Sequence, residues 1–188
     1  MKRDCQHRHA VQFYEDSSSL CRTVADFLAG GLISGEPAVV IAWPHHEPQI
    51  LANLAQRSVN VDYARRTGDL VLLDVDDTLG AFMLDGTPDF ALFDRYMGTI
   101  LGQITRVRPR TTVRAYGEMV DVLWKAGRVD AAIKLEMMWN ALATKHSFSL
   151  LCGYAMGQFY KQPDLFDRVC AAHDRIVSID PSPLQSTA

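Results

Sequence analysis

The side chains of this sequence best suited to chemistry are two carboxylates and their polar neighbours. Glu118 follows Gly117 at the end of a short strand-like run, residues 111–116. Glu136 and Asn140 lie four residues apart, which puts both on one face of a predicted helix. Open α/β folds commonly build a ligand site from an acid just past a strand end and a second acid on a nearby helix. The sequence therefore predicts a site here, although a structural role for the Glu136–Asn140 pair is an equal alternative.

Acidic and aromatic side chains recur at the carboxyl ends of the predicted strands. Parallel strands end at one edge of their sheet, and open α/β sheets bind ligands beyond that edge. We therefore assign one candidate ligand site to these positions and to the predicted helix of Glu136. Its residues are Tyr14, Glu15, Trp43, Glu118, Glu136, Trp139, Asn140 and Tyr154.

The first strand–helix junction argues against nucleotide binding. A phosphate-binding loop at this place uses glycine backbone N–H groups and a lysine. Residues 14–19 contain neither glycine nor lysine, and the carboxylates of Glu15 and Asp16 would repel phosphate. We expect that the protein neither binds ATP tightly nor hydrolyses it.

Local patterns do not favour a metal site. Cys5, His7 and His9 alternate along an extended segment, but chain termini rarely build such sites and no CxxC or HExxH partner is present. The acids at 74–77 could bind Mg²⁺ beside a substrate phosphate, yet an acidic turn is the favoured interpretation. We assign no metal ligands, and the sequence names no cofactor.

The serine, cysteine and other histidine patterns do not indicate a catalytic site. No GxSxG signature surrounds a serine or cysteine. His45 and His46 are adjacent and would point apart on a strand or a helix. His173, on the apolar face of a predicted helix, is interpreted as a hydrogen-bonded core residue.

Strand-like and helical segments alternate along the chain. Strands are predicted at residues 9–14, 37–43, 70–75, 111–116 and 147–154. Helices are predicted around 20–28 and 50–54, over 78–83, from Thr87 to 104, on both sides of 125–127, and over 163–177, with a polar connection at 60–68. Several strands are apolar throughout, which indicates a mostly parallel sheet covered by helices on both faces. The predicted fold class is α/β.

Length and composition fit one soluble domain. The 188 residues are enough for one substantial core, and a net charge of −3 argues against nucleic-acid binding. No apolar run reaches the ~18 residues of a membrane span, and no signal peptide precedes the first strand. With four scattered cysteines, we expect a cytoplasmic protein with reduced thiols.

Six motifs together resemble the MEDS sensory domains, named for methanogens, methylotrophs and a dichloromethane-responsive regulator. They are HAVQFYED (9–16), GEPAVVIA (35–42), GDLVLLD (68–74), YGEMVDVLW (116–124), LEMMWN (135–140) and FSLLCGY (148–154). The resemblance implies a RecA/KaiC-like α/β core that has lost its phosphate-binding loop. It also implies a signal-input module for small organic molecules, usually fused to a DNA-binding or histidine-kinase part. We expect this domain over 9–178, an extension at 1–8 and a disordered tail at 179–188.

The resulting hypothesis is a non-enzymatic sensory module that binds a small organic ligand at the carboxyl edge of its sheet. The chain shows no output part, so we expect a regulatory protein partner in trans or self-association, with contact through 163–177. One alternative is an enzyme that uses Glu118 with Glu136 or Tyr154 as acid and base. Another is an interaction domain with a vestigial pocket.

Overall fold

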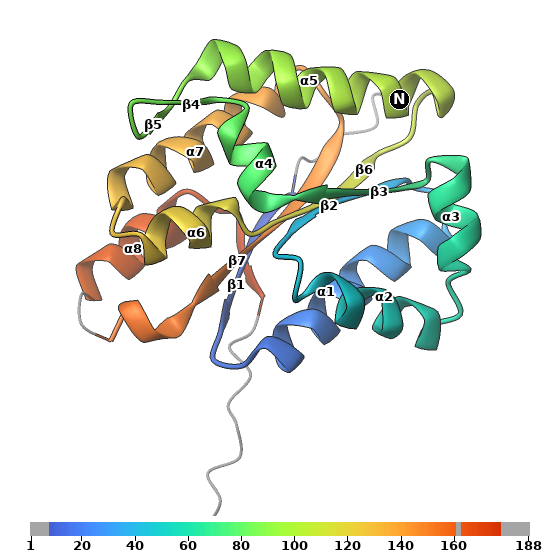
Figure 1. Ribbon diagram of the computed structural model, residues 1–188, viewed down its shortest axis with the longest axis horizontal. Helices are drawn as coiled ribbons and strands as arrows, with labels where there is room; N and C mark the ends of the chain where they lie inside the picture. Colours follow the sequence, from blue (N-terminus) through green and yellow to red (C-terminus); the bar gives the residue numbers. More distant parts are fainter. Residues whose placement is uncertain (1–7, 161–162, 178–188) are drawn as a thin grey trace, which may run out of the picture.

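A six-stranded parallel sheet forms the centre of the protein (Figure 1). The structure, a computed structural model, describes residues 8–160 and 163–177. Strands lie in the order β3-β2-β6-β7-β1-β8 and pair in parallel throughout. They are β1 (Arg8–Tyr14), β2 (Ala38–Ala42), β3 (Leu70–Asp74), β6 (Val113–Gly117), β7 (Phe148–Ala155) and β8 (Arg175–Val177).

Helices cover both faces of this sheet (Figure 1). One face carries α1 (Ser17–Ile33), α2 (Glu47–Gln56) and α3 (Val61–Thr67). The other carries α4 (Val75–Gly80), α5 (Phe90–Val107), α6 (Met119–Lys125), α7 (Val129–Leu142) and α8 (Pro163–Ala171). A small hairpin of β4 (Met83–Leu84) and β5 (Thr87–Pro88) precedes α5, and a 3₁₀ turn (Met156–Gln158) follows β7. The α/β class and the parallel sheet with helices on both faces are confirmed.

The sheet divides the hydrophobic core into two clusters. On β1, Val11 and Phe13 face the α5–α8 side, whereas Ala10 and Tyr14 face the α1 side. Successive side chains of a strand point to opposite faces, so a strand covered on both faces is apolar at every position. All five residues of β2 are buried for this reason. Within the described residues no helix is long and apolar enough to cross a membrane.

The end of the chain differs from the prediction. The predicted helix over 163–177 ends at Ala171, and Arg175–Val177 instead forms the edge strand β8 beside β1. Two hydrogen bonds hold the turn between them: Asp174 N–H donates to the His9 carbonyl at 2.8 Å, and His9 N–H donates to Asp174 Oδ2 at 3.0 Å. These partners are distant in sequence, so local periodicity could not reveal the strand.

Side-chain caps move three other boundaries. The predicted start of α5 at Thr87 is wrong, because Asp89 caps the helix by accepting the Leu92 N–H at 2.9 Å. Asp74 likewise accepts two N–H groups of the first turn of α4, so this helix begins earlier than predicted and the acidic turn has a structural role. The predicted polar connection at 60–68 contains α3, which Asn60 caps. The predicted extension and tail lie outside the described residues, except that Arg8 begins β1.

Candidate functional site

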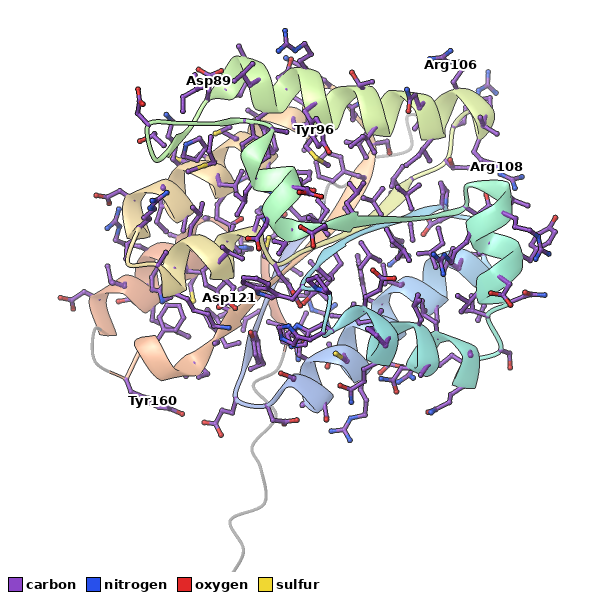
Figure 2. The ribbon with its side chains drawn as sticks, in the orientation of Figure 1. Asp89, Tyr96, Arg106, Arg108, Asp121 and Tyr160 are labelled. Atoms are coloured by element: carbon purple, nitrogen blue, oxygen red, sulfur yellow. The ribbon has the colours of Figure 1, made fainter. Side chains whose placement is uncertain are left out.

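Most of the candidate site residues fall into two separate groups, one at the carboxyl edge of the sheet and one under α7. The first group, the edge network, lies at the carboxyl ends of the strands and consists of Tyr14, Ser17, Trp43, His46, Glu118, Asp121 and Lys125. The second group, the buried cluster, lies under α7 and consists of His9, Glu136, Asn140, Cys152, Tyr154 and His173. Figure 2 labels Asp121 of the edge network, which projects from α6.

Glu118 is the centre of the edge network. It lies between the end of β6 and the first residue of α6, and it is completely buried. Its Oε2 accepts the Trp43 backbone N–H at 2.7 Å, and its Oε1 accepts the Tyr116 hydroxyl at 2.8 Å. The same Oε1 lies 2.7 Å from Nδ1 of His46. Both carboxylate oxygens therefore bind protein groups, as a buried carboxylate requires.

His46 connects Glu118 to the surface. A carboxylate only accepts hydrogen bonds, so the Nδ1 of His46 donates to it, and in the neutral ring Nε2 is then an acceptor. That Nε2 lies 2.9 Å from the hydroxyl of Ser17, an exposed residue at the start of α1. Sequence reasoning missed both residues; the only signal was the His45–His46 pair just beyond β2. His45 is exposed and His46 is buried, but their ring centroids lie only 4.2 Å apart, so the expectation that these side chains point apart is wrong.

Tyr14, Asp121 and Lys125 complete the edge network. Tyr14 donates to Asp121 Oδ2 at 2.9 Å, and Lys125 contacts the same oxygen at 2.7 Å. Asp121 Oδ1 accepts the backbone N–H of Ala155 at the end of β7. Burial, and next to it the Asp121 carboxylate, raise the pKa of Tyr14 well above its ordinary value, so its hydroxyl stays a donor. Glu15 is exposed and accepts from the hydroxyl of Tyr160.

Glu136 is the centre of the buried cluster. It is completely buried on α7 and accepts the Tyr154 hydroxyl at Oε1 over 2.8 Å. His9 Nε2 lies 3.1 Å from Oε2, and His173 Nε2 lies 3.3 Å from Oε1. Cys152 Sγ lies 3.4 Å from Oε2. His173 also binds the Val169 carbonyl, which agrees with its expected role as a hydrogen-bonded residue.

The charges of the buried cluster are coupled. Burial by itself would raise the pKa of Glu136, but the imidazoles of His173 and His9 lower that pKa well below its usual value. Burial would lower the pKa of His173, and the Glu136 carboxylate instead raises it. Burial and the same carboxylate raise the pKa values of Cys152 and Tyr154 well above their ordinary ones. Glu136 is therefore a carboxylate at neutral pH.

The remaining candidates have structural contacts. Asn140 Oδ1 lies 2.8 Å from His9 Nδ1, and its Nδ2 donates to the Ala172 carbonyl at 3.0 Å. Trp139 is buried and packs edge-on against Phe93. Asn140 thus holds the segment after α8, while Trp139 belongs to the core.

The two carboxylates do not contact each other. Tyr116, which binds Glu118, packs in the cluster beside α1, whereas Tyr154, which binds Glu136, packs in the cluster on the opposite face. The structure brings Glu118 together with Trp43, and Glu136 together with Tyr154 and Asn140. A joint acid–base role for Glu118 and Glu136 has no geometric support.

A groove of about 800 Å³ lies on the α1 face, at the amino-terminal halves of the strands. Its charged lining residues come from α1, β6 and the β8 segment: Asp26, Arg114, Asp174 and Arg175. Arg114 is bound to Glu36 at 2.6 Å and lies over the Phe27 ring. This groove is at the opposite end of the sheet from the predicted ligand edge, and no sequence pattern indicated it.

The sequence of most of the chain matches the model of a known family. The sequence model of the "MEthanogen/methylotroph, DcmR Sensory domain" (MEDS) matches residues 8–174. A KaiC-like protein from the hyperthermophilic archaeon Pyrococcus horikoshii has a similar structure, with a TM-score of 0.49 and 14% identity. The likeness covers 79% of this chain and 61% of that one. No curated protein is significantly similar in sequence. The matched range contains both the edge network and the buried cluster.

Proposed function

We propose, since the chain belongs to the family of MEDS sensory domains, that it is a signal-input domain for a small organic ligand. The ligand binds at the carboxyl edge of the sheet, and the bound state is passed to a regulatory partner. Family membership supports the signal-input role. The edge network supports the location of the ligand.

The observation that carries this location is the chain of hydrogen bonds from Ser17 through His46 to Glu118. It begins at an exposed hydroxyl and ends at a completely buried carboxylate. It joins the start of α1, the connection between β2 and α2, and the end of β6. A ligand that binds Ser17 or replaces its bond to His46 changes a contact shared by all three segments. Such a ligand distinguishes two states of the domain, which signalling requires.

The surroundings of Ser17 restrict the class of ligand. Glu15 and Asp16 are exposed beside it, so an anion is disfavoured, and the half-buried Trp43 ring offers an apolar surface at this edge. We therefore propose a neutral or cationic small molecule that combines a hydroxyl or amino group with a short apolar part.

Removal of the Ser17 hydroxyl tests the proposal. Native mass spectrometry of the purified protein identifies any co-purifying molecule, and thermal melts with short-chain alcohols, amines and amides serve as the screen. A compound that raises the melting temperature of the wild type should lose its effect in Ser17→Ala and keep it in Ser34→Ala, a matched change at the far end of α1. Equal shifts in both variants, or no active compound and no co-purified molecule, would contradict the proposal.

The Ser17–His46–Glu118 arrangement also favours a second candidate function, acyl transfer. Its order and its distances of 2.9 and 2.7 Å are those of a nucleophile, a base and an orienting carboxylate. The serine follows a strand and begins a helix, but the neighbouring Glu15 and Asp16 disfavour an oxyanion. Hydrolysis of p-nitrophenyl acetate and labelling by a fluorophosphonate, both lost in Ser17→Ala, would establish this activity. Reversible ligand binding without labelling would exclude acyl transfer and support the sensory function.

A further inference from the structure

Four side chains with metal-ligand chemistry converge inside the protein. His9 on β1, Glu136 on α7, Cys152 on β7 and His173 between α8 and β8 each direct one ligand atom at the others, and these atoms all lie within 4.8 Å of one another. His9 and Glu136 are completely or almost completely buried, and the side chain of His173 is fully buried. The group draws on two strands, one helix and the connection between α8 and β8.

Three of these atoms, from His9, Glu136 and Cys152, have the spacing of ligands around a tetrahedrally coordinated ion, and His173 Nε2 lies within 4.8 Å of them. His9 Nε2 lies 3.1 Å from Glu136 Oε2 and 3.4 Å from Cys152 Sγ. Cys152 Sγ lies 3.4 Å from Glu136 Oε2, and His173 Nε2 lies 3.3 Å from Glu136 Oε1. Around zinc, bonds of about 2.0–2.1 Å to nitrogen and about 2.3 Å to sulfur put neighbouring ligand atoms roughly 3.2–3.7 Å apart.

The hydrogen bonds on the far side of each imidazole fix its tautomer. Asn140 uses its Nδ2 to donate to the Ala172 carbonyl, so its Oδ1 accepts from the Nδ1–H of His9 at 2.8 Å. His173 Nδ1 lies 2.7 Å from the Val169 carbonyl, which also only accepts. In neutral rings, both Nε2 atoms therefore carry lone pairs. Both lone pairs point at one carboxylate.

Two acceptors facing each other need a proton or a cation between them. One imidazolium would balance the charge of the carboxylate but would leave the Nε2 lone pair of the other ring facing an acceptor, and two would leave an excess positive charge in a fully buried space, which is costly. Moreover, His173 Nε2 is a buried atom for which the described residues provide no hydrogen bond of acceptable geometry, despite its 3.3 Å approach to Glu136. A divalent cation satisfies all of these atoms at once.

We propose that His9, Glu136, Cys152 and His173 form a structural binding site for a divalent transition-metal ion, with zinc as the best fit. Imidazole, thiolate and carboxylate are all zinc ligands, and four protein ligands without an open position are typical of a structural site. On metal binding the Cys152 thiol would release its proton to solvent, so that one thiolate and one carboxylate would balance the two positive charges of the ion. Asn140, the Val169 carbonyl and the Tyr154 hydroxyl orient the ligands. The site is independent of the ligand proposed at the sheet edge.

Cobalt substitution tests the site in the full chain. The protein is stripped of metal with a chelator, titrated with Co²⁺ and then with Zn²⁺. We expect one Co²⁺ per chain, intense visible bands of a tetrahedral ion, a near-ultraviolet thiolate-to-cobalt band, and displacement by Zn²⁺ that raises the melting temperature. A wild-type protein that shows neither the bands nor the thermal shift would overturn the proposal, and this result does not depend on any variant.

Cysteine variants locate the ion. Cys152→Ser should abolish the thiolate band and weaken metal binding at least tenfold. Cys21→Ser, which changes another buried cysteine on the opposite face, should bind as the wild type does. If Cys152→Ser does not fold, judged by circular dichroism, His173→Gln takes its place and should lose tetrahedral geometry. Retention of the band in Cys152→Ser, or its loss in Cys5→Ser alone, would put the ion elsewhere and refute the assignment.

Discussion

Glu118 shows how one buried carboxylate organises the sheet edge. Its two oxygens receive hydrogen bonds from a backbone N–H, a tyrosine hydroxyl and an imidazole. The sequence indicated the position of this acid correctly, because Gly117 and the preceding strand mark the end of β6. Its partners come from other strands and could not be deduced. Direct contact between Glu118 and a ligand stays a prediction, whereas the structure shows the hydrogen bond between Glu118 and His46.

Replacing Glu118 with glutamine should destabilise the protein. The amide has a single acceptor oxygen and turns an NH₂ group toward at least one of the three donors that now bind the carboxylate. An unsatisfied buried donor costs about 1–3 kcal/mol, so the free energy of unfolding should fall by this amount. Urea unfolding measures it, with Glu15→Gln as an exposed control that should change it by less than about 0.5 kcal/mol. Unchanged stability in Glu118→Gln would show that the carboxylate serves a ligand instead.

Three buried tyrosines predict a sharp loss of stability in alkali. Burial, together with nearby carboxylates, raises the pKa values of Tyr14, Tyr116 and Tyr154 above 10.0. A raised pKa in the folded state means that the contribution is fully present below the unfolded pKa of about 10 and is lost as pH rises above it. Urea midpoints should therefore fall from about pH 10 upward. Absorbance at 295 nm should show these tyrosines ionising only together with unfolding; their free titration in the folded protein would contradict this.

At the scale of the elements, the hydrophobic pattern of the sequence was sufficient to predict a strand or helix where a whole face of that element is buried. The five strands predicted from apolar runs correspond to β1, β2, β3, β6 and β7. It failed where stability comes from a distant partner or from a single cap. The three residues of β8 are mostly exposed and owe their conformation to pairing with β1. The start of α5 depends on one side chain, that of Asp89.

The cap of α5 can be tested directly. Asp89→Ala removes the acceptor of the Leu92 N–H and should lower the free energy of unfolding by about 0.5–2 kcal/mol. Thr87→Ala, the cap expected from sequence, changes an exposed hairpin residue and should cost less than about 0.5 kcal/mol. Chemical denaturation of both variants gives the two values. A larger loss of unfolding free energy in Thr87→Ala than in Asp89→Ala would support the start of α5 at Thr87 that was predicted from the sequence.

At the scale of the whole molecule, the buried cluster lies outside the reach of local motifs. His9, Glu136 and Cys152 each occur in one of the segments that resemble the MEDS domains, so the sequence marked these segments without joining them. Only the pairing of β1 with β7 and the packing of α7 over them bring the three residues together. His173 lies in the turn that places β8 beside β1, and this turn brings it to the other three residues. Long-range topology determines this site, while the edge acid Glu118 is visible from local sequence.

The position of His173 leads to a prediction about the path of a signal. This residue lies between α8 and β8, and Asn140 and Asp174 also bind the same segment to the sheet and α7. Arg168 of α8 adds an exposed bond to Asp130 of α7 at 3.0 Å. A bound ion should therefore fix the 163–177 segment, which is also where we expect a partner to bind. Hydrogen exchange followed by mass spectrometry should show slower exchange in α8 and β8 when Zn²⁺ is added to metal-free protein. Peptides from α1 and α2 on the opposite face should change little.

The Asn140→Ala variant distinguishes ordering of the 163–177 segment by the ion from stabilisation of the whole domain. The variant loses the bond to the Ala172 carbonyl and the acceptor for His9 Nδ1–H, so exchange in α8 and β8 should rise and the zinc effect should shrink. Thr144→Ala, an exposed change just beyond the end of α7, is the matched control. Uniform protection by zinc across the domain would mean that the ion stabilises the fold without controlling the 163–177 segment. In that case the partner-binding surface must be sought elsewhere, with the edge network as the first place to look.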